Sequence, residues 1–428
     1  MSKLDELIKE LCPDGVEYKE LNSVCRFQNG FSFKSPLFKS SGLPILRITN
    51  ISNGEIKDSD FVYFEKSDYK EDLSNYEVKK GDVVVAMSGA TTGKIGYNYS
   101  NNTYYLNQRV GLFVPNENKL SKRYLFHWLT SQSNNILNIS SGSGAQPNLS
   151  SVKMMEFIIP IPPLPVQEEI VRILDKFTSL TAELTAELTA RRKQYEYYRD
   201  SLLTRETKVE IKKLGELCQQ ISNIKWKNEK NSFQYIDLTS VDRETHEIIN
   251  PTKIDSSNAP SRAQQIVKEN DVLFGTTRPM LKRSTFISKE FDGQICSTGY
   301  CVLRPNQEIV KPRYIYHHIN SSLFYQYVET HQQGASYPAI SDADIKNFAI
   351  PLPPLDIQQR IVNVLDNFDA ICSDLKIGLP AEIDARKKQY EYYRDLLLTF
   401  AERGNTIFTE QNRTEQNRTE QNRTEQMR

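Results

Sequence analysis

The residues best suited to chemistry form a short loop, SGATTGK, at positions 88–94. Its small residues, hydroxyls and lysine are similar to a phosphate-binding loop, in which backbone N–H groups and a lysine hold phosphates. The spacing argues against nucleotide hydrolysis, because only three residues separate Gly89 from Gly93. In addition, Ile95 stands where a magnesium-binding hydroxyl is needed.

A second loop of this kind, GTTRPMLKRST, lies at 275–285 in the other half of the chain. Hydroxyls, lysines and arginines that follow a strand are suited to hydrogen bonding with a DNA backbone. The alternative for each residue is a tight turn with a solvated basic side chain. Because the pattern occurs in both halves, we favour DNA contact. The candidate donors are Ser88, Thr91, Thr92, Lys94, Thr276, Thr277, Arg278, Lys282 and Arg283.

Aromatic residues among lysines form a weaker candidate surface. NGFSFK at 29–34 and NIKWK at 223–227 place Lys34, Lys225 and Lys227 beside aromatic rings. Exposed rings of this kind suit nucleic-acid contact. Core packing, however, explains a lone phenylalanine more often.

Base reading is the role expected of two further loops, SGSGAQPN at 141–148 and QQGASYP at 332–338. A glutamine can pair in a bidentate way with adenine. Arg47, in a strand-like segment, either reaches a base edge or caps the edge of a sheet. The residues assigned to this role are Arg47, Gln146, Gln333, Ser336 and Tyr337.

No catalytic constellation accompanies these residues. The sequence has no GxSxG, no HExxH and no Asn-Pro-Pro-aromatic tetrad of the amino methyltransferases, and its six cysteines and five histidines show no zinc-like spacing. The pairs His317–His318 and Tyr197–Tyr198 lie in helical patterns, where packing is the better explanation. We therefore expect a protein that binds without catalysing.

The overall charge places a condition on DNA binding. The chain has 54 basic and 54 acidic residues, so binding must rest on local basic patches. No apolar run approaches the roughly 20 residues that span a bilayer, and the first residues follow an amphipathic helix pattern rather than a secretory signal. We expect a reduced, cytoplasmic protein without a membrane partner.

The candidate loops belong to two copies of one longer pattern. Residues 159–204 contain IPIPPLPVQEEIVRILDKF and later RRKQYEYYRDSLLT, and residues 350–399 contain IPLPPLDIQQRIVNVLDNF and later RKKQYEYYRDLLLT. Shorter segments match in the same order, such as VKKGDVVVA with VKENDVLFG. An internal duplication explains these matches.

The elements around the loops follow from periodicity. DVVVAM and RVGLFV predict strands, whereas 121–137 and 311–328 predict amphipathic helices. The prolines of 158–165 exclude a helix and predict an extended segment. Apolar residues then recur at spacings of three and four, which predicts a helix of about 37 residues, roughly 55 Å long.

The two predicted long helices differ in continuity. The apolar stripe of the first includes Leu184 and Leu188, within TAELTAEL. The second is interrupted by Gly378-Leu379-Pro380 and is expected to resume at Ala381.

These patterns predict an α+β fold in which two similar mixed α/β domains are held apart by a pair of long antiparallel coiled-coil helices, with pseudo-twofold symmetry. The expected parts are a first globular domain at 1–157, an extended segment with the central helix at 158–205, a second globular domain at 206–348, and an extended segment with the distal helix at 349–400. The tail at 401–428 is expected to be disordered, because its TEQNR repeats at 409–428 have almost nothing to bury.

The helical motifs identify a family resemblance. VQEEIVRILDKF, RRKQYEYYRD and their second copies resemble the specificity subunit of type I restriction-modification systems, and the repeated TAEL tetrapeptides at 181–188 are similar to those of its IC group. The resemblance covers residues 1 to about 400 and leaves out only the C-terminal repeats.

The resemblance implies that each globular domain is a target recognition domain that reads one half of a bipartite double-stranded DNA site. The long helices would set the spacer between the half-sites and dock two modification subunits. S-adenosylmethionine, ATP and magnesium would be bound by modification and motor subunits, with no cofactor on this chain. From the residues alone, a non-enzymatic two-domain scaffold for protein partners remains an alternative.

Overall fold

The computed structural model describes residues 2–52, 54–141, 147–204, 209–374 and 377–400. The chain forms two units: unit 1 extends to Leu180 and resumes at Arg386, and unit 2 is Thr181–Ala385. Each unit therefore contains the end of a long helix from the other repeat copy. The tail at 401–428, predicted to be disordered, lies outside the described residues.

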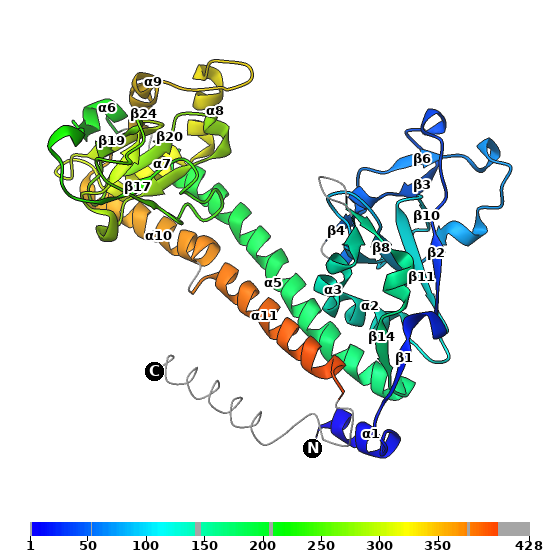
Figure 1. Cartoon of the computed structure of the whole chain (residues 1–428). Coiled ribbons are helices and arrows are strands. Elements are labelled where there is room, and N and C mark those ends of the chain that lie inside the picture. Colours follow the sequence, from blue (N-terminus) through cyan, green and yellow to red (C-terminus); the bar gives the residue numbers. More distant parts are fainter. Residues whose placement is uncertain (1, 53, 142–146, 205–208, 375–376, 401–428) are drawn as a thin grey trace. The chain divides into compact units, whose positions relative to one another are not determined.

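Unit 1 carries the first set of strands and short helices (Figure 1). They are α1 (Lys3–Leu11), β1 (Glu17–Glu20), β2 (Cys25–Asn29), β3 (Leu43–Leu46), β4 (Ile51–Ser52), β5 (Gly54–Ile56), β6 (Val62–Phe64), β7 (Glu77–Val78), β8 (Val83–Ala86), β9 (Ile95–Tyr97), β10 (Tyr104–Leu106), β11 (Val110–Pro115), α2 (Lys122–Ser131), α3 (Ser133–Asn138), β12 (Ser140–Ser141), β13 (Asn148–Leu149), α4 (Ser151–Met155) and β14 (Ile158–Ile161).

The central sheet of unit 1 has the order β2-β11-β8-β9-β5-β4, and a second sheet has the order β6-β3-β10-β7. Strand β8 is apolar at every position because both faces of its sheet are covered. Val83 and Val85 belong to the cluster that includes α2, whereas Val84 and Ala86 belong to a separate cluster with Tyr104. The strands predicted at 82–87 and 109–114 are confirmed.

Unit 2 carries a similar series. Its elements are β15 (Ile211–Lys213), α6 (Leu214–Leu217), β16 (Cys218–Gln219), β17 (Phe233–Ile236), β18 (Thr252–Ile254), β19 (Ala263–Ile266), β20 (Val272–Gly275), β21 (Ser284–Phe286), β22 (Ile295–Ser297), β23 (Tyr300–Pro305), α7 (Pro312–Ile319), α8 (Ser322–His331), α9 (Asp342–Asn347), β24 (Ala349–Pro351) and α10 (Leu355–Ser373). Its two larger sheets have the orders β16-β23-β20-β21 and β18-β17-β22-β19.

The helices predicted at 121–137 and 311–328 are each divided in two. In unit 1, Gln132 separates α2 from α3. In unit 2, the Ser321 hydroxyl accepts a hydrogen bond from Phe324 N at 3.2 Å and starts α8 as a new helix. A serine in this position satisfies a free N–H at a helix N-terminus, so it favours a new start over continuation.

The long helix α5 (Leu164–Thr204) has 41 residues, which corresponds to roughly 60 Å. The extended segment predicted at 158–165 is shorter than expected, because strand β14 ends at Ile161 and the helix starts at Leu164. Pro165 lies in the first turn, where a proline needs no hydrogen-bonded N–H.

The interruption of the second copy is confirmed. Helix α10 ends at Ser373, and α11 (Leu379–Leu398) begins two residues earlier than the predicted Ala381. Pro380 is again tolerated in a first turn. Among the described residues, no helix combines the length and apolarity required to cross a bilayer.

A buried glutamine ties the start of each long helix to its unit. The side chain of Gln167 accepts from Ser121 N at 2.9 Å and donates to the carbonyls of Lys119 and Pro162 at 2.7 and 2.8 Å. Gln358 makes the same three bonds to Lys311 N and to the carbonyls of Ile309 and Pro353, at 2.8, 3.2 and 2.7 Å. Both side chains are fully buried.

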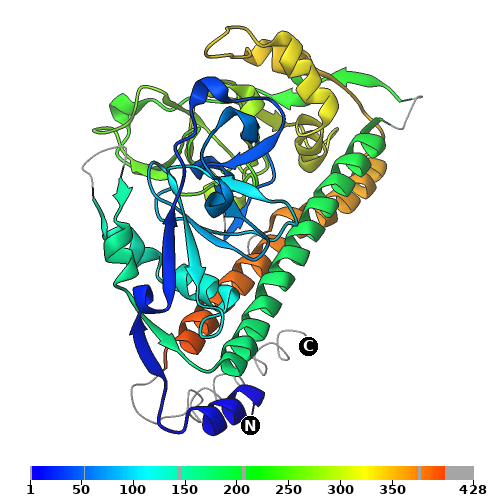
Figure 2. The ribbon, with the colours of Figure 1, turned by 90° about the vertical axis from the view of Figure 1, so that its right-hand side faces the viewer.

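Within each unit, α5 runs alongside a helix of the second repeat copy (Figure 2), and an aromatic stack joins the two helices. In unit 1 the rings of Phe177 on α5 and Tyr393 on α11 stack at 5.2 Å, and in unit 2 those of Tyr198 on α5 and Phe368 on α10 stack at 5.5 Å. The predicted stripe residues Leu184 and Leu188 are half-buried, and Leu188 packs against the core of unit 2.

Candidate nucleic-acid interface

Two of the predicted loops in unit 2 are joined by backbone hydrogen bonds. Thr277 pairs with Ala339 in an isolated bridge, and Arg278 N donates to the Pro338 carbonyl at 2.7 Å. Gln333 and Ala339 exchange two bonds, each of 2.8 Å. The loops 275–285 and 333–339 therefore form one surface, although 47 residues separate them in sequence.

Backbone strain is concentrated in the basic loop. Arg278 and Lys282 have φ values of 48° and 55°, in the left-handed region that few non-glycine residues adopt. They flank the 3₁₀ turn Pro279–Leu281. Each such residue costs about 1–3 kcal/mol, and strain of this kind persists where the surrounding structure or the function requires it.

The basic side chains of this loop are oriented by aromatic rings. The guanidinium of Arg278 lies 4.4 Å from the centre of the Tyr337 ring, and the ammonium of Lys282 lies 5.0 Å from that of Tyr325. Tyr337 is 69% exposed. Thr276 instead acts inside the protein, because its hydroxyl donates to the Gly299 carbonyl at 2.9 Å.

Arg283 lies near two other arginines, Arg243 and Arg278, and near the carboxylate of Asp237. Burial, together with the nearby charges of Arg243 and Arg278, lowers the pKa of the Arg283 guanidinium from its usual value. Within the described residues, neither these arginines nor Lys282 forms an ion pair with a carboxylate. A cluster of arginines without direct ion pairs is suited to binding a polyanion.

Arg243 is a candidate that the sequence patterns did not reveal. It lies in a turn that Asp242 organises, since the Asp242 carboxylate accepts from Glu244 N and Thr245 N at 2.8 Å each. The acidic neighbours at 242 and 244 outnumber this one basic residue, so the segment looks acidic in sequence. Only its proximity to Arg283 in the folded chain indicates a role.

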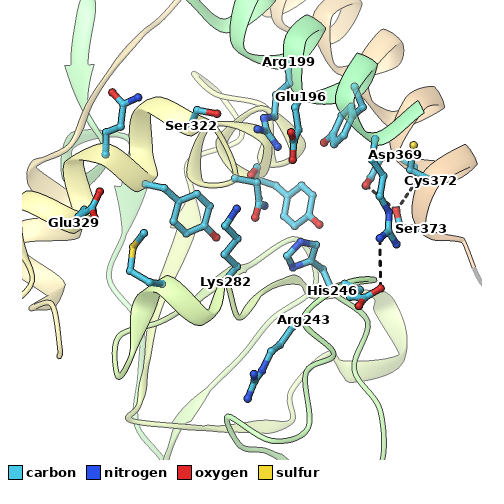
Figure 3. Close-up of a pocket in the computed structure, with 18 residues that line it drawn as sticks. Glu196, Arg199, Arg243, His246, Lys282, Ser322, Glu329, Asp369, Cys372 and Ser373 are labelled. Atoms are coloured by element: carbon cyan, nitrogen blue, oxygen red, sulfur yellow. Dashed lines mark hydrogen bonds and ion pairs between the residues drawn. The ribbon is translucent and has the colours of Figure 1, made fainter. Parts of the chain in front are cut away.

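A cavity of about 470 Å³ lies beside this cluster in unit 2 (Figure 3). Its lining mixes basic and acidic side chains, including Lys282, Arg243, Glu196 and Asp369. Figure 3 shows Arg243 extending away from Glu196 and Asp369. The acids make the interior a poor site for a phosphate, so the cationic surface is at its edge.

In unit 1 the SGATTGK loop is held by its own threonines. The Thr92 hydroxyl, which is buried, donates to the carbonyls of Gly89 and Pro147 at 2.7 and 2.9 Å, and the Thr91 hydroxyl donates to the Ile48 carbonyl at 3.2 Å. These bonds brace the loop. Lys94 is exposed, and the buried Ser88 hydroxyl has no hydrogen-bond partner within the described residues.

The remaining candidates are placed as follows. Arg47 follows β3 and donates to the Asp60 carbonyl at 3.0 Å, which directs it along the protein. Lys34, Lys225, Lys227 and Ser336 are exposed. Their aromatic neighbours are largely packed, since Phe33 is 5% exposed and Trp226 donates to the Ala263 carbonyl at 2.7 Å. Gln146 lies outside the described residues.

Metal-ligand chemistry finds no support in the described part of the chain, where no group of three or more His, Cys, Asp or Glu side chains could hold a metal ion. The site thus consists of hydrogen-bond donors, cations and aromatic rings on braced loops.

Comparison with known families decides the identity of this arrangement. The model of the type I restriction modification DNA specificity domain matches residues 13–191 and again residues 206–385. The chain belongs to the type I restriction-modification specificity family. The duplicated match fits two target recognition domains, and it removes the reason to retain the protein-scaffold alternative. Specificity subunits are non-catalytic, since the enzymatic activities reside on other subunits.

Individual members of the specificity family support this assignment. The chain is 34% identical to the EcoR124I/EcoR124II specificity subunit of Escherichia coli over 66% of this chain and 72% of that protein. It is 28% identical to a putative type I restriction enzyme specificity subunit of Haemophilus influenzae, over 90% and 96% of the two chains.

A solved structure supports the fold of the specificity subunit. It was described in work on complex assembly and conformational transition of the type I restriction-modification system, and it matches with a TM-score of 0.53 at 19% identity. The match covers 90% of this chain and 97% of that one. At this level of identity the likeness concerns the fold alone.

Proposed function

We propose that each recognition domain of this specificity subunit reads one half of a bipartite, asymmetric double-stranded DNA site. The observation that carries the proposal is the cationic cluster of Arg243, Arg278 and Arg283 on loops that join two sequence-distant segments. A duplicated specificity domain supplies two such readers. We retain 1–157 and 206–348 as the bounds of the recognition domains.

Within the second domain, phosphate and base contacts fall to different side chains. Arg243, Arg278, Lys282 and Arg283 are suited to phosphates, because they are cations without ion-pair partners in the described residues. The exposed Gln333, Ser336 and Tyr337 on the adjoining loop are then available for base edges. In the first domain we propose the exposed Lys94 as the corresponding donor, with Lys34 and Arg47 as further contacts.

The long helices are proposed to act as the frame of the subunit. We propose that they pair as an antiparallel coiled coil with pseudo-twofold symmetry, and that TAELTAEL places the chain in the IC group. The length of α5 would then set the number of unspecified base pairs between half-sites. Each aromatic stack between helices supports pairing inside its unit.

The catalytic partners are assigned by the same proposal. Two modification subunits would dock on the helical frame, bind S-adenosylmethionine and methylate adenine. Motor subunits would add ATP and magnesium chemistry, and this chain would bind none of these cofactors. Since the substrate is cellular DNA, we propose a cytoplasmic location.

Long-read methylation profiling tests the function. DNA should be compared from cells that express the modification subunits with and without this chain. The expected result is a split adenine-methylated motif that depends on the chain. Active modification subunits that give no new split motif in its presence would contradict the proposal.

A further inference from the structure

A buried histidine in unit 1 links the recognition domain to two long helices. His127 on α2 bonds through Nε2 to Asp175 Oδ1 on α5 at 2.8 Å, and through Nδ1 to the Tyr390 hydroxyl on α11 at 2.9 Å. One turn earlier, Arg123 donates through Nε to the same oxygen of Asp175, also at 2.8 Å. The imidazole is fully buried, so its two nitrogens depend on these partners for their hydrogen bonds.

Unit 2 contains the same arrangement. His317 on α7 bonds through Nε2 to Asp366 Oδ1 on α10 at 2.7 Å and through Nδ1 to the Tyr195 hydroxyl on α5 at 3.1 Å. Arg313 donates to Asp366 at 2.8 Å, as Arg123 does to Asp175. Packing alone, which the sequence suggested for His317, does not account for a network repeated bond by bond.

The chemistry of the imidazole makes the tyrosine necessary. Burial lowers the pKa of both histidines, so each ring is neutral, with one donor and one acceptor nitrogen. The nitrogen facing the carboxylate is the donor, and Nδ1 must accept. A tyrosine supplies the required hydroxyl, and burial raises the pKa of Tyr390 to about 12, so the phenol keeps its proton.

The two tyrosines are exchanged between the repeat copies. Both are the first tyrosine of QYEYYRD, but Tyr390 belongs to the second copy and bonds in unit 1. Tyr195 belongs to the first copy and bonds in unit 2. The aspartates are not exchanged, since Asp175 and Asp366 each follow the recognition domain that they contact.

We propose that Tyr195 and Tyr390 are positioning residues, each of which fixes the recognition domain encoded in the other repeat copy. Reading of one half-site therefore depends on a tyrosine from the opposite half of the sequence. This inference rests on the proposed function, in which each domain reads one half-site. The structural part stands independently of DNA.

Amide hydrogen exchange on the purified full chain tests the structural part. Tyr390→Phe should increase exchange in α2 about tenfold and leave α7 unchanged, because His127 loses its donor and stays buried. Tyr195→Phe should do the reverse. The matched controls are Tyr197→Phe and Tyr392→Phe, which alter exposed tyrosines of the same motif. Equal effects on α2 and α7, or no effect on either, would contradict the assignment of each tyrosine to the domain of the other repeat copy.

Methylation profiling with the modification subunits then tests the functional part. The half-site of each domain is assigned first, by substituting Arg278 and Lys282 in the second domain. Tyr390→Phe should reduce discrimination about tenfold at the half-site of the first domain only, and Tyr195→Phe at that of the second. The proposal would be overturned if each variant lost discrimination at the half-site of the domain in its own repeat copy, or if both half-sites were affected equally. If the wild-type chain produces no split motif, the proposed function fails. The hydrogen-exchange result still decides whether each tyrosine fixes the recognition domain of the other repeat copy.

Discussion

Arg278 shows how a single side chain combines strain, aromatic contact and charge. Its backbone is left-handed, its guanidinium lies over Tyr337, and its charge adds to that around Arg283. The left-handed backbone and the repulsion between like charges cost free energy in the isolated protein, whereas the contact with Tyr337 is favourable. DNA phosphates would offset the cost, which is why we assign this residue to the backbone of the bound half-site.

Replacing Arg278 and Lys282 with alanine should weaken only the half-site read by the second domain. Each lost phosphate contact makes the negative slope of log affinity against log salt shallower by about 1. The slope can be measured by DNA binding at several salt concentrations, together with methylation profiling. Lys253→Ala, an exposed lysine in β18, is the control and should leave the slope unchanged. Equal loss at both half-sites would show that the basic loop is misplaced.

At this scale the sequence predicted residue types better than contacts. Hydroxyls and cations after strands pointed to both basic loops, yet Thr91 and Thr92 use their hydroxyls to bond carbonyls inside unit 1. Arg243 was missed because Arg283, which lies near it in the folded chain, comes from a distant segment. Hydrogen-bond partners depend on tertiary proximity, which no local spacing records.

The elements were more predictable, because long helices and buried strands have a strong period. The errors are at their ends. Pro165 and Pro380 lie inside first turns rather than before them, and the Ser321 cap divides a helix that the apolar pattern joins. In both cases the position of the helix end is decided by contacts within a single turn of backbone, which a longer apolar pattern does not record.

The glutamine at the start of α10 should be among the more stabilising polar residues. Gln358→Ala leaves Lys311 N and two carbonyls without their buried partner, and should lower the free energy of unfolding by about 3 kcal/mol. Urea unfolding measures the change. Gln359→Ala, which removes a bond to Asn363 on the helix surface, should change it by less than about 0.5 kcal/mol. Similar losses in both variants would refute the role of the buried amide.

Deleting Thr185–Leu188 should shorten the spacer and leave both half-sites unchanged. Four residues correspond to about 6 Å of helix and about 40° beyond a full turn, comparable with one to two base pairs at about 3.4 Å. The Thr185 hydroxyl donates along the helix to the Thr181 carbonyl at 2.7 Å, and the Thr185 carbonyl accepts from the Thr189 hydroxyl at 2.9 Å, so bonds of this kind can re-form in a shorter helix.

Sequencing of the methylated sites reads out the spacer. A variant that keeps the length but carries Thr185→Ala and Glu187→Ala is the control and should retain the original spacer. Altered half-site bases with unchanged spacing would contradict the proposal that the length of α5 sets the spacer.

Across the whole molecule, buried neutral histidines link stability to pH. Burial lowers the pKa of His127, His246 and His317, and that of His318 to about 3. An unfolded histidine titrates near 6.5. The unfolded chain therefore takes up protons that the folded chain cannot, and stability is lost as the pH falls below about 6.5.

Between pH 7.5 and 5.5, His318 alone should lower the free energy of unfolding by about 1 kcal/mol. Urea unfolding at both pH values checks this, and His318→Phe should show a smaller decrease. A decrease that is the same in the variant would exclude His318 as a source of the pH dependence.

One contact in unit 1 bears on the order in which the segments of the chain could be connected. The Tyr18 hydroxyl, on β1, donates to the carbonyl of Phe400, just past α11. In the other repeat copy the corresponding step, from the end of α5 to β15, is made by the continuous chain. What is a covalent junction in one copy is a noncovalent one in the other. The same fold is therefore compatible with a circularly permuted chain, in which the end of α11 is linked covalently to β1. The new termini would lie between Thr204 and Ile211, and the second recognition domain would be synthesised first.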